Sequence, residues 1–342
     1  MALLARSVLS PSLAVKLSSL GTKLGRERRD RELGETLTEL SALPAAHIVR
    51  ASHEIARAAR FGWWQEPSLM DELFGWPPSE RKLMATNPNY AWLFLFHPNG
   101  RVREAALHSI TAPPDSPFFL AALAWRLNDW AEPVRQAAKQ CVKRTSSEIP
   151  ASVAADAALY LLERRFVWGR WRDEADVLDL VFMRDDVLAA LARQLGELPT
   201  GPLATCLRNA LRYPGIDQYL PRLAVAAVQP SVRAVAYKCL ISGKATWIAG
   251  FEWSWIDKVY GLRRRIPTFE TRDLGRDRAA TDFVVDGIQD KSAFVRKVVA
   301  DSMIAVRPQI PDEETLVARL AKDRSSAVRS RADFLLRHPT KT

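Results

Sequence analysis

The stretch Asp290-Lys-Ser-Ala-Phe-Val295-Arg296 recurs in the sequence as a motif that separates two apolar segments. Residues 323–329 read Asp-Arg-Ser-Ser-Ala-Val-Arg and residues 129–135 read Asp-Trp-Ala-Glu-Pro-Val-Arg, so the Asp, the Val and the final Arg are shared. Weaker copies without the Asp lie at 97–103 and 228–233. Apolar residues recur at helical spacing on both sides of the motif, which predicts two helices joined at it.

The spacing of the copies predicts a repeat protein. The motif arginines Arg103 and Arg135 are 32 residues apart, and Arg296 and Arg329 are 33 residues apart. The longer gaps on either side of Arg233 are close to three and two such periods. A constant period in this range is typical of stacked helix pairs.

The same period predicts helical units in the gaps between the copies. It places units near residues 168, 200 and 265, and the last of these, Ala245–Arg265, is a degenerate one. Strand signals are nearly absent, because the one Asn-Gly pair, Asn99-Gly100, lies between two helical patterns rather than between alternating apolar residues. We therefore expect an all-α chain.

An Asp-x4-Val-Arg motif between paired helices, repeated at this period, resembles the HEAT repeats of the armadillo-type α-solenoids. The resemblance covers about Asn87 to His338. It implies a right-handed solenoid of about eight helix pairs, in which the motif arginines join neighbouring repeats through carboxylates in a ladder. The Asp is also placed to cap the second helix of its pair, a contact worth about 0.5–2 kcal/mol. The ladder residues are then Asp129, Arg135, Arg233, Asp290, Arg296, Asp323 and Arg329.

The sequence upstream of the repeats divides into two further parts. Residues 1–35 have no acidic residue before Glu27 and predict an amphipathic, basic helical extension, which docks either on its own body or on a partner. Residues 36–86 are helical on both sides of Pro44 and then rich in Trp, as expected for a cap on the open end of a solenoid, with a binding loop as the alternative. Residues 87–342 hold the repeats.

The composition favours an ordinary folded protein. The 342 residues are 48% apolar and 26% charged, and no apolar run approaches the roughly 20 residues of a membrane span. The cysteines Cys141, Cys206 and Cys239 are scattered and predict small buried side chains in a reducing compartment. We expect a cytoplasmic protein. Its formal net charge of +10 favours acidic partners in general.

No pattern of catalytic or metal-binding residues stands out. Histidines and cysteines show no metal-ligand spacing, and GxSxG, GxGxxG and phosphate-binding glycine loops are missing from the sequence. We expect no catalytic residue, no metal and no cofactor.

One enzymatic alternative is an alkylpurine DNA glycosylase, a solenoid that holds a damaged base between tryptophans beside a carboxylate and an arginine. Trp125 lies one helical turn before Asp129, and Arg164 and Arg165 follow one repeat later. However, Asp129 is already the regular Asp of its repeat, which makes this the weaker interpretation.

Two departures from the repeat are candidate binding sites. Each fills an inter-helix turn with Arg and Trp, a combination that suits phosphate contacts and base stacking and also the hot spots of protein interfaces. The alternative is that the Trp rings are core and the Arg head groups are solvated above them. The candidate residues are Arg164, Arg165, Trp168, Arg170, Trp171, Arg172, Trp253, Trp255, Arg263, Arg264 and Arg265.

These observations predict a non-enzymatic scaffold that binds another macromolecule, because repeat solenoids present extended surfaces. A protein partner, with the chain as a subunit or adaptor of a complex, is the first expectation. Nucleic acid bound by the Arg- and Trp-rich turns is the second. The sequence predicts neither the identity of the partner nor the oligomeric state.

Overall fold

The chain folds into two compact units. The computed structural model describes residues 7–20, 26–60, 80–171, 173–307, 310 and 313–338. It is mostly helical and divides into Met1–Phe182 (unit 1) and Met183–Thr342 (unit 2). This boundary falls inside the predicted repeat region 87–342, and the two N-terminal parts that we predicted as separate belong to unit 1. The Trp-rich stretch of the predicted cap, 61–79, lies outside the described residues.

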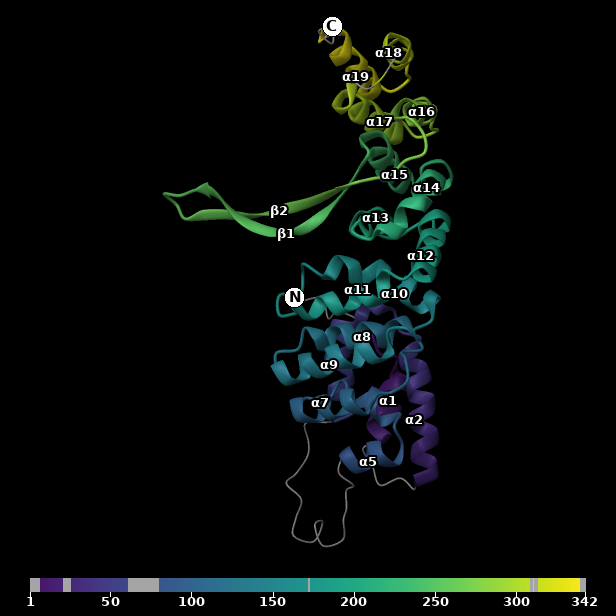
Figure 1. Cartoon of the computed structure of the whole chain (residues 1–342). Coiled ribbons are helices and arrows are strands. Elements are labelled where there is room, and N and C mark those ends of the chain that lie inside the picture. Colours follow the sequence, from purple (N-terminus) through teal and green to yellow (C-terminus); the bar gives the residue numbers. More distant parts are fainter. Residues whose placement is uncertain are drawn as a thin grey trace. The chain divides into compact units, whose positions relative to one another are not determined.

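Unit 1 is organised around one buried helix (Figure 1). Helix α8 contacts α3, α9 and α10, and every side chain from Phe118 to Ala124 is buried. Ser116 starts α8, because its hydroxyl accepts a hydrogen bond from the N–H of Phe119. The helices of unit 1 are α1 (Pro11–Leu20), α2 (Arg26–Ser41), α3 (Ile48–Ala58), α5 (Glu80–Thr86), α6 (Tyr90–Phe94), α7 (Gly100–Ser109), α8 (Pro117–Leu127), α9 (Glu132–Thr145), α10 (Ala151–Arg164) and α11 (Asp179–Phe182), with 3₁₀ turns at Ala45–His47 and Asp173–Leu178.

The N-terminal helix docks on its own unit. Leu13 and Leu17 of α1 are buried, and α1 contacts α2 and α3. Glu54 of α3 accepts hydrogen bonds from the backbone N–H groups of Val8 and Leu9, at 2.8 and 3.2 Å, just before α1 begins. Of the two docking modes that the sequence left open, the described residues adopt the one on the chain's own body.

Unit 2 shows the contacts of a helical repeat. Helix α15 contacts α13 and α17, and α17 contacts α19, while α14 contacts α12 and α16. First helices of neighbouring pairs therefore pack on first helices, and second helices on second helices, as α7 and α9 also do in unit 1. The helices of unit 2 are α12 (Asp185–Glu197), α13 (Leu203–Ala210), α14 (Leu220–Ala226), α15 (Pro230–Ser242), α16 (Ala280–Gly287), α17 (Ala293–Ala305), α18 (Glu313–Ala321) and α19 (Ser326–Arg337), with a 3₁₀ turn at Pro214–Tyr219.

The segment that we predicted as a degenerate helical unit is a β-hairpin, and this prediction was wrong. Strands β1 (Lys244–Asp257) and β2 (Leu262–Asp273) pair antiparallel. The large side chains Phe251, Trp253 and Trp255 alternate with smaller or polar residues at the period of a strand. At the turn, the Asp257 carboxylate accepts two backbone N–H bonds, and Gly261 has a φ of +65°, which a glycine adopts without strain.

The hairpin is an insertion between two repeats. Arg233 of α15 pairs with Asp290, which lies 57 residues further along the chain, whereas the equivalent pairs are 26 and 27 residues apart. Helices α15 and α17 pack together despite the intervening strands. Because the segment 244–273 is about as long as one repeat, it kept the 32–33-residue phase intact and concealed the insertion.

One end of the hairpin is fixed to unit 2 and the other end is exposed. The Arg272 guanidinium forms two hydrogen bonds of 2.6 Å with the Asp217 carboxylate and also donates to the Leu211 carbonyl, and Ala245 is buried. Beyond this fixed end, the ribbon of β1 and β2 extends away from the helices of unit 2 (Figure 1). We call Phe251–Pro267 the arm.

Candidate functional site

The five motif arginines bind the turn that precedes their own helix. In each, Nη1 donates to the backbone carbonyl oxygens six and five residues earlier, at 2.7 to 3.4 Å. The motif thus satisfies carbonyl groups of the turn that no helix hydrogen bond reaches. The residues are Arg103, Arg135, Arg233, Arg296 and Arg329.

Three of these arginines also reach the aspartate of the next motif. Nε and Nη2 each donate to one carboxylate oxygen, at 2.6 to 2.9 Å, and the aspartate in turn accepts the N–H two residues on. Arg135 contacts Glu174 instead, at 3.1 Å. These paired bonds join neighbouring helix pairs, and their geometry is that of a bidentate charge-assisted contact. The joints are Arg103–Asp129, Arg233–Asp290 and Arg296–Asp323.

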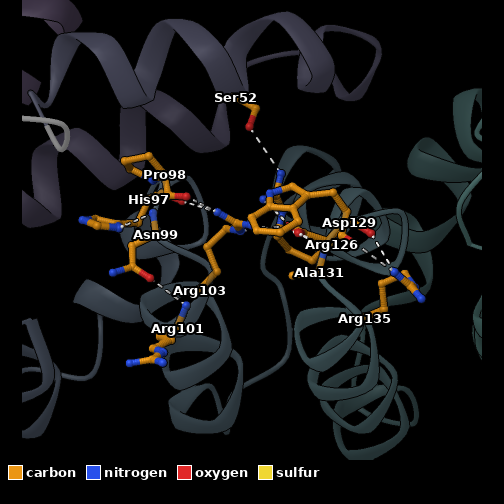
Figure 2. Close-up of polar contacts among 11 residues, drawn as sticks. Ser52, His97, Pro98, Asn99, Arg101, Arg103, Arg126, Asp129, Ala131 and Arg135 are labelled. Atoms are coloured by element: carbon orange, nitrogen blue, oxygen red, sulfur yellow. Dashed lines mark hydrogen bonds and ion pairs between the residues drawn. The ribbon is translucent and has the colours of Figure 1, made fainter.

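The joint at Asp129 is a buried cluster of three charges (Figure 2). Besides the two bonds from Arg103, the Asp129 carboxylate accepts one from Arg126 Nη1 at 2.9 Å and one from the Ala131 N–H at 3.1 Å. The side chains of Asp129, Arg103 and Arg126 are 2%, 4% and 8% exposed. Burial lowers the pKa of Arg126 to about 10 against the opposing effect of Asp129, so Arg126 is still charged at neutral pH. Asp129 is therefore fully occupied as the shared counter-ion of Arg103 and Arg126.

The residues of the glycosylase alternative each have contacts of their own within unit 1. The Trp125 ring packs edge-on against Trp168, with centroids 4.9 Å apart. Arg164 lies over the Tyr160 ring at 4.5 Å, and Arg165 pairs with two aspartates on the far side of the next turn. The arrangement stabilises the helix packing of unit 1 and leaves Asp129 with no oxygen directed at a ligand.

Two tryptophans that we predicted as contact residues are core residues. Trp168 is 8% exposed and Trp171 is 2% exposed. Their rings pack on each other at 4.8 Å, and Trp171 Nε1 donates to the Arg165 carbonyl oxygen at 3.2 Å. Here the alternative weighed from the sequence, Trp as core, describes the structure better, because an indole ring buries a large apolar area once its N–H has a partner.

The arginines of this turn have different roles. Arg165 pairs with Asp176 and Asp179, and Arg164 stacks on Tyr160. Arg170 is exposed, and its backbone N–H donates to Asn128 at 2.9 Å. Arg172 lies outside the described residues. Of the predicted binding residues in this turn, Arg170 is the one that the structure places at the surface with its side chain open to a partner.

Arg170 helps to line a polar hollow of about 490 Å³. Its lining contains both acidic and basic side chains, and two of them, Arg135 and Glu174, pair with each other. Trp130, just before α9, is 70% exposed. Glu132, Gln136 and Lys139 of α9 were not predicted as contact residues, because their spacing is that of any solvated helix face. The lining residues are Glu132, Arg135, Gln136, Lys139, Gly169, Arg170 and Glu174.

The arm carries the second predicted patch. Register pairs Trp253 with Arg265 and Trp255 with Arg263, so these four residues share one face of the ribbon, together with Phe251. Trp253 and Trp255 are 57% and 53% exposed. The Arg263 guanidinium lies 4.5 Å from the centroid of the Trp253 ring, and Arg265 lies 4.7 Å from that of Phe251. We call this the aromatic face of the arm. Arg264 lies on the opposite face.

The Arg296–Asp323 joint predicts a pH dependence of stability in unit 2. Hydrogen bonds from Arg296 and from the Ser325 N–H hold the pKa of Asp323 below its ordinary value of 3.8. A carboxyl group whose pKa is lower in the folded than in the unfolded chain stabilises the fold above its unfolded pKa, and this contribution is lost as the pH falls through the folded pKa. The difference in unfolding free energy between the wild type and Asp323→Asn should therefore shrink from pH 6 to pH 3. Chemical denaturation at several pH values measures it, and a constant difference would contradict the assigned role.

Comparison of the sequence with known proteins gives no family and no relative from which a function could be inferred. No family model matches the chain, and no curated protein shows significant similarity to it. In the described part of the chain, no three His, Cys, Asp or Glu side chains gather as a metal site would require. Among those same residues, no helix has both the length and the apolar character needed to cross a membrane.

Proposed function

We propose that the chain is a HEAT-type, right-handed α-solenoid of about eight helix pairs that serves as a non-enzymatic scaffold for another macromolecule, as a subunit or adaptor of a complex. The arginine–aspartate joints support the HEAT assignment, because the same contacts recur at three places and join consecutive pairs. Stacked pairs bury one continuous core and leave long surfaces for a partner.

The bonding of Asp129 supports a scaffold over an enzyme. A catalytic carboxylate must direct an oxygen at the substrate or at a water molecule. Asp129 accepts four hydrogen bonds from its own chain and is 2% exposed. The strongest candidate for catalysis in the sequence is thus used to hold helix pairs together.

The side chains of the hollow in unit 1 favour a protein as the partner. With Arg135 and Glu174 paired to each other, Glu132, Lys139 and Arg170 offer both signs of charge. The exposed ring of Trp130 lies in the turn that leads into α9. The Trp130 ring lies 6.0 Å from the Arg103 guanidinium and precedes the lining residue Glu132 by two positions. Mixed charge and an exposed Trp on neighbouring parts of one turn and helix are typical of a protein interface, where Trp and Arg are the usual hot spots. The Trp130 side chain is the observation that carries this proposal.

A nuclease-controlled capture tests the protein partner. The tagged full chain is incubated with extract of its native cell, with and without nuclease, and each captured protein is then purified and rebound to the pure chain. We expect a direct partner that survives nuclease and binds at least tenfold more weakly to Trp130→Ala/Arg170→Glu, because truncating one hot spot costs about 2 kcal/mol or more.

Lys143→Glu is the matched control, since Lys143 is an exposed residue of α9 outside the lining of the hollow. Its binding should stay within about twofold of the wild type. Partners that disappear on nuclease treatment, or that bind all three proteins equally, would contradict a protein site at the hollow.

Nucleic acid is the second candidate, and one observation on the arm favours it. Arg263, Arg264 and Arg265 are exposed and adjacent to exposed aromatic rings, which is the composition of surfaces that bind nucleic acid through phosphates and stacked bases. This site is separate from the hollow, so a scaffold subunit can use both.

A further inference from the structure

We propose that the aromatic face of the arm, formed by Phe251, Trp253, Trp255, Arg263 and Arg265, binds single-stranded nucleic acid. The inference deepens the second candidate above and is independent of the protein partner proposed for the hollow. It rests on the charge, the ring geometry and the spacing of this face.

The positive charge of the arm favours an anionic partner. None of Arg263, Arg264 and Arg265 lies within 4.0 Å of a carboxylate of the described residues. Other arginines of unit 2 have carboxylate partners within the chain, as Arg272 has Asp217 and Arg233 has Asp290. Three adjacent guanidinium groups without counter-ions form a site of positive potential that phosphate groups can neutralise.

The cation–π contacts prepare the arginines for phosphate. A guanidinium group that lies over a ring uses its π face, and its N–H donors point outward in the plane of the group. Arg263 lies over the Trp253 ring at 4.5 Å and Arg265 over the Phe251 ring at 4.7 Å, distances that suit such contacts. Each arginine is therefore oriented before binding and loses little side-chain freedom when an oxyanion arrives. The exposed surfaces of the Trp rings remain open to stacking.

The spacing of the face suits a strand of unpaired bases. Side chains two residues apart on a strand are about 6.7 Å from each other, so Phe251, Trp253 and Trp255 form a row of rings at that interval. Bases in a duplex are stacked on one another and cannot offer their faces, whereas unpaired bases can. These features favour a single strand bound without strong sequence preference.

The turn of the hairpin offers the competing interpretation. Ile256, Val259, Tyr260 and Leu262 are all more than half exposed, and such apolar residues are suited to a protein pocket. However, they lie at the turn, whereas the unpaired arginines are in the strand beside the rings. A protein bound to the arm is therefore an outcome of the test below.

The test measures binding of defined oligonucleotides to the full chain. Fluorescein-labelled dT15 and U15 are titrated with the protein at 50, 100 and 200 mM salt, and an unlabelled 15-base-pair duplex serves as competitor. We expect dT15 and U15 to bind, with a slope of log K against log salt of about −1.4 to −2, as two to three phosphate contacts to a single strand produce. The duplex should compete at least tenfold more weakly than unlabelled dT15.

Three variants locate the site. Trp253→Ala/Trp255→Ala should weaken binding at least tenfold, since one stacked base contributes about 5- to 150-fold. Arg263→Glu/Arg265→Glu should abolish measurable binding at 100 mM salt. Arg264→Glu is the matched control on the opposite face of the same strand and should lower affinity by no more than about threefold. Circular dichroism checks that each variant keeps the helical content of the wild type.

Several results would overturn the proposal. These are failure of dT15 and U15 to bind at 50 mM salt, equal loss of affinity in Arg263→Glu/Arg265→Glu and in the control Arg264→Glu, or equal competition by the duplex. A nuclease-resistant protein that binds the pure chain and is lost on Trp253→Ala/Trp255→Ala would assign the arm to a protein instead. The hollow variant Trp130→Ala/Arg170→Glu should bind dT15 as the wild type does, so failure at the arm and failure at the hollow are separable.

Discussion

Replacing Asp129 with alanine is expected to cost unit 1 about 5 kcal/mol of unfolding free energy, the upper end of the effect of breaking a buried ion pair. The variant leaves two buried guanidinium groups, Arg103 and Arg126, without their shared counter-ion. As a helix cap alone, Asp129 would contribute only about 0.5–2 kcal/mol. The larger value follows from the arrangement in Figure 2, where one carboxylate serves two arginines and a backbone N–H.

Hydrogen–deuterium exchange of α7, α8 and α9 measures this effect within unit 1. Asp323→Ala is the matched control, because Asp323 has the same motif position but accepts from one arginine and is 10% exposed. The decrease in unfolding free energy for Asp323→Ala should be smaller and confined to unit 2. A decrease in unfolding free energy of less than 2 kcal/mol for Asp129→Ala would contradict the role of Asp129 as the shared counter-ion. Release of alkylated bases by the wild type, but not by Asp129→Asn, would restore the glycosylase interpretation.

The Arg233–Asp290 joint is expected to give the second largest effect. The two side chains are 2% and 7% exposed, so Asp290→Ala should cost unit 2 about 3–5 kcal/mol, because it leaves Arg233 buried and unpaired. Burial alone would raise the pKa of Asp290, but the bonds from Arg233 and the Ser292 N–H outweigh it and lower that pKa. The carboxylate is therefore ionised at neutral pH.

A double-mutant cycle measures the interaction energy between Arg233 and Asp290 separately from the effect of each single substitution. Arg233→Met should cost a similar amount to Asp290→Ala, and the double variant should lose clearly less than the sum, since no charge is then left unpaired. Urea denaturation supplies the three free energies. Strict additivity would show that the two residues act independently and that the hairpin is not bridged by this contact.

Much of the helical organisation follows from local sequence. The Asp-x4-Val-Arg motif contains the contacts of its own turn, since the Arg donates to carbonyl groups five and six residues earlier in the same stretch. Contacts of this short range can be predicted from a single copy of the motif, and the constant period of the copies indicates that they stack. The period places Arg296 and Asp323 in one ladder, whereas Arg103, which bonds Asp129, was not among the predicted ladder residues.

The candidate sites were less predictable, because exposure is set by what packs above a residue. Trp168 and Trp253 have similar Arg-rich neighbours in the sequence, yet Trp168 meets Trp125 and Trp171 and is buried, whereas Trp253 is 57% exposed. No local pattern distinguishes them. The polar hollow likewise combines residues of α9 with Arg170 and Glu174, which lie 31 or more positions beyond Arg135 to Lys139.

The sequence by itself determined the helix pairs, the motif turns and the chemical character of the two Arg–Trp segments, because each depends on side chains within about one turn or one period. The tertiary structure decided that Lys244–Asp273 is an inserted hairpin, that Asp129 serves two arginines, and which tryptophans reach the surface. Strand pairing, counter-ion sharing and burial all join residues far apart in the chain. Their free energies depend on desolvation and contact, which exist only once the helices have packed.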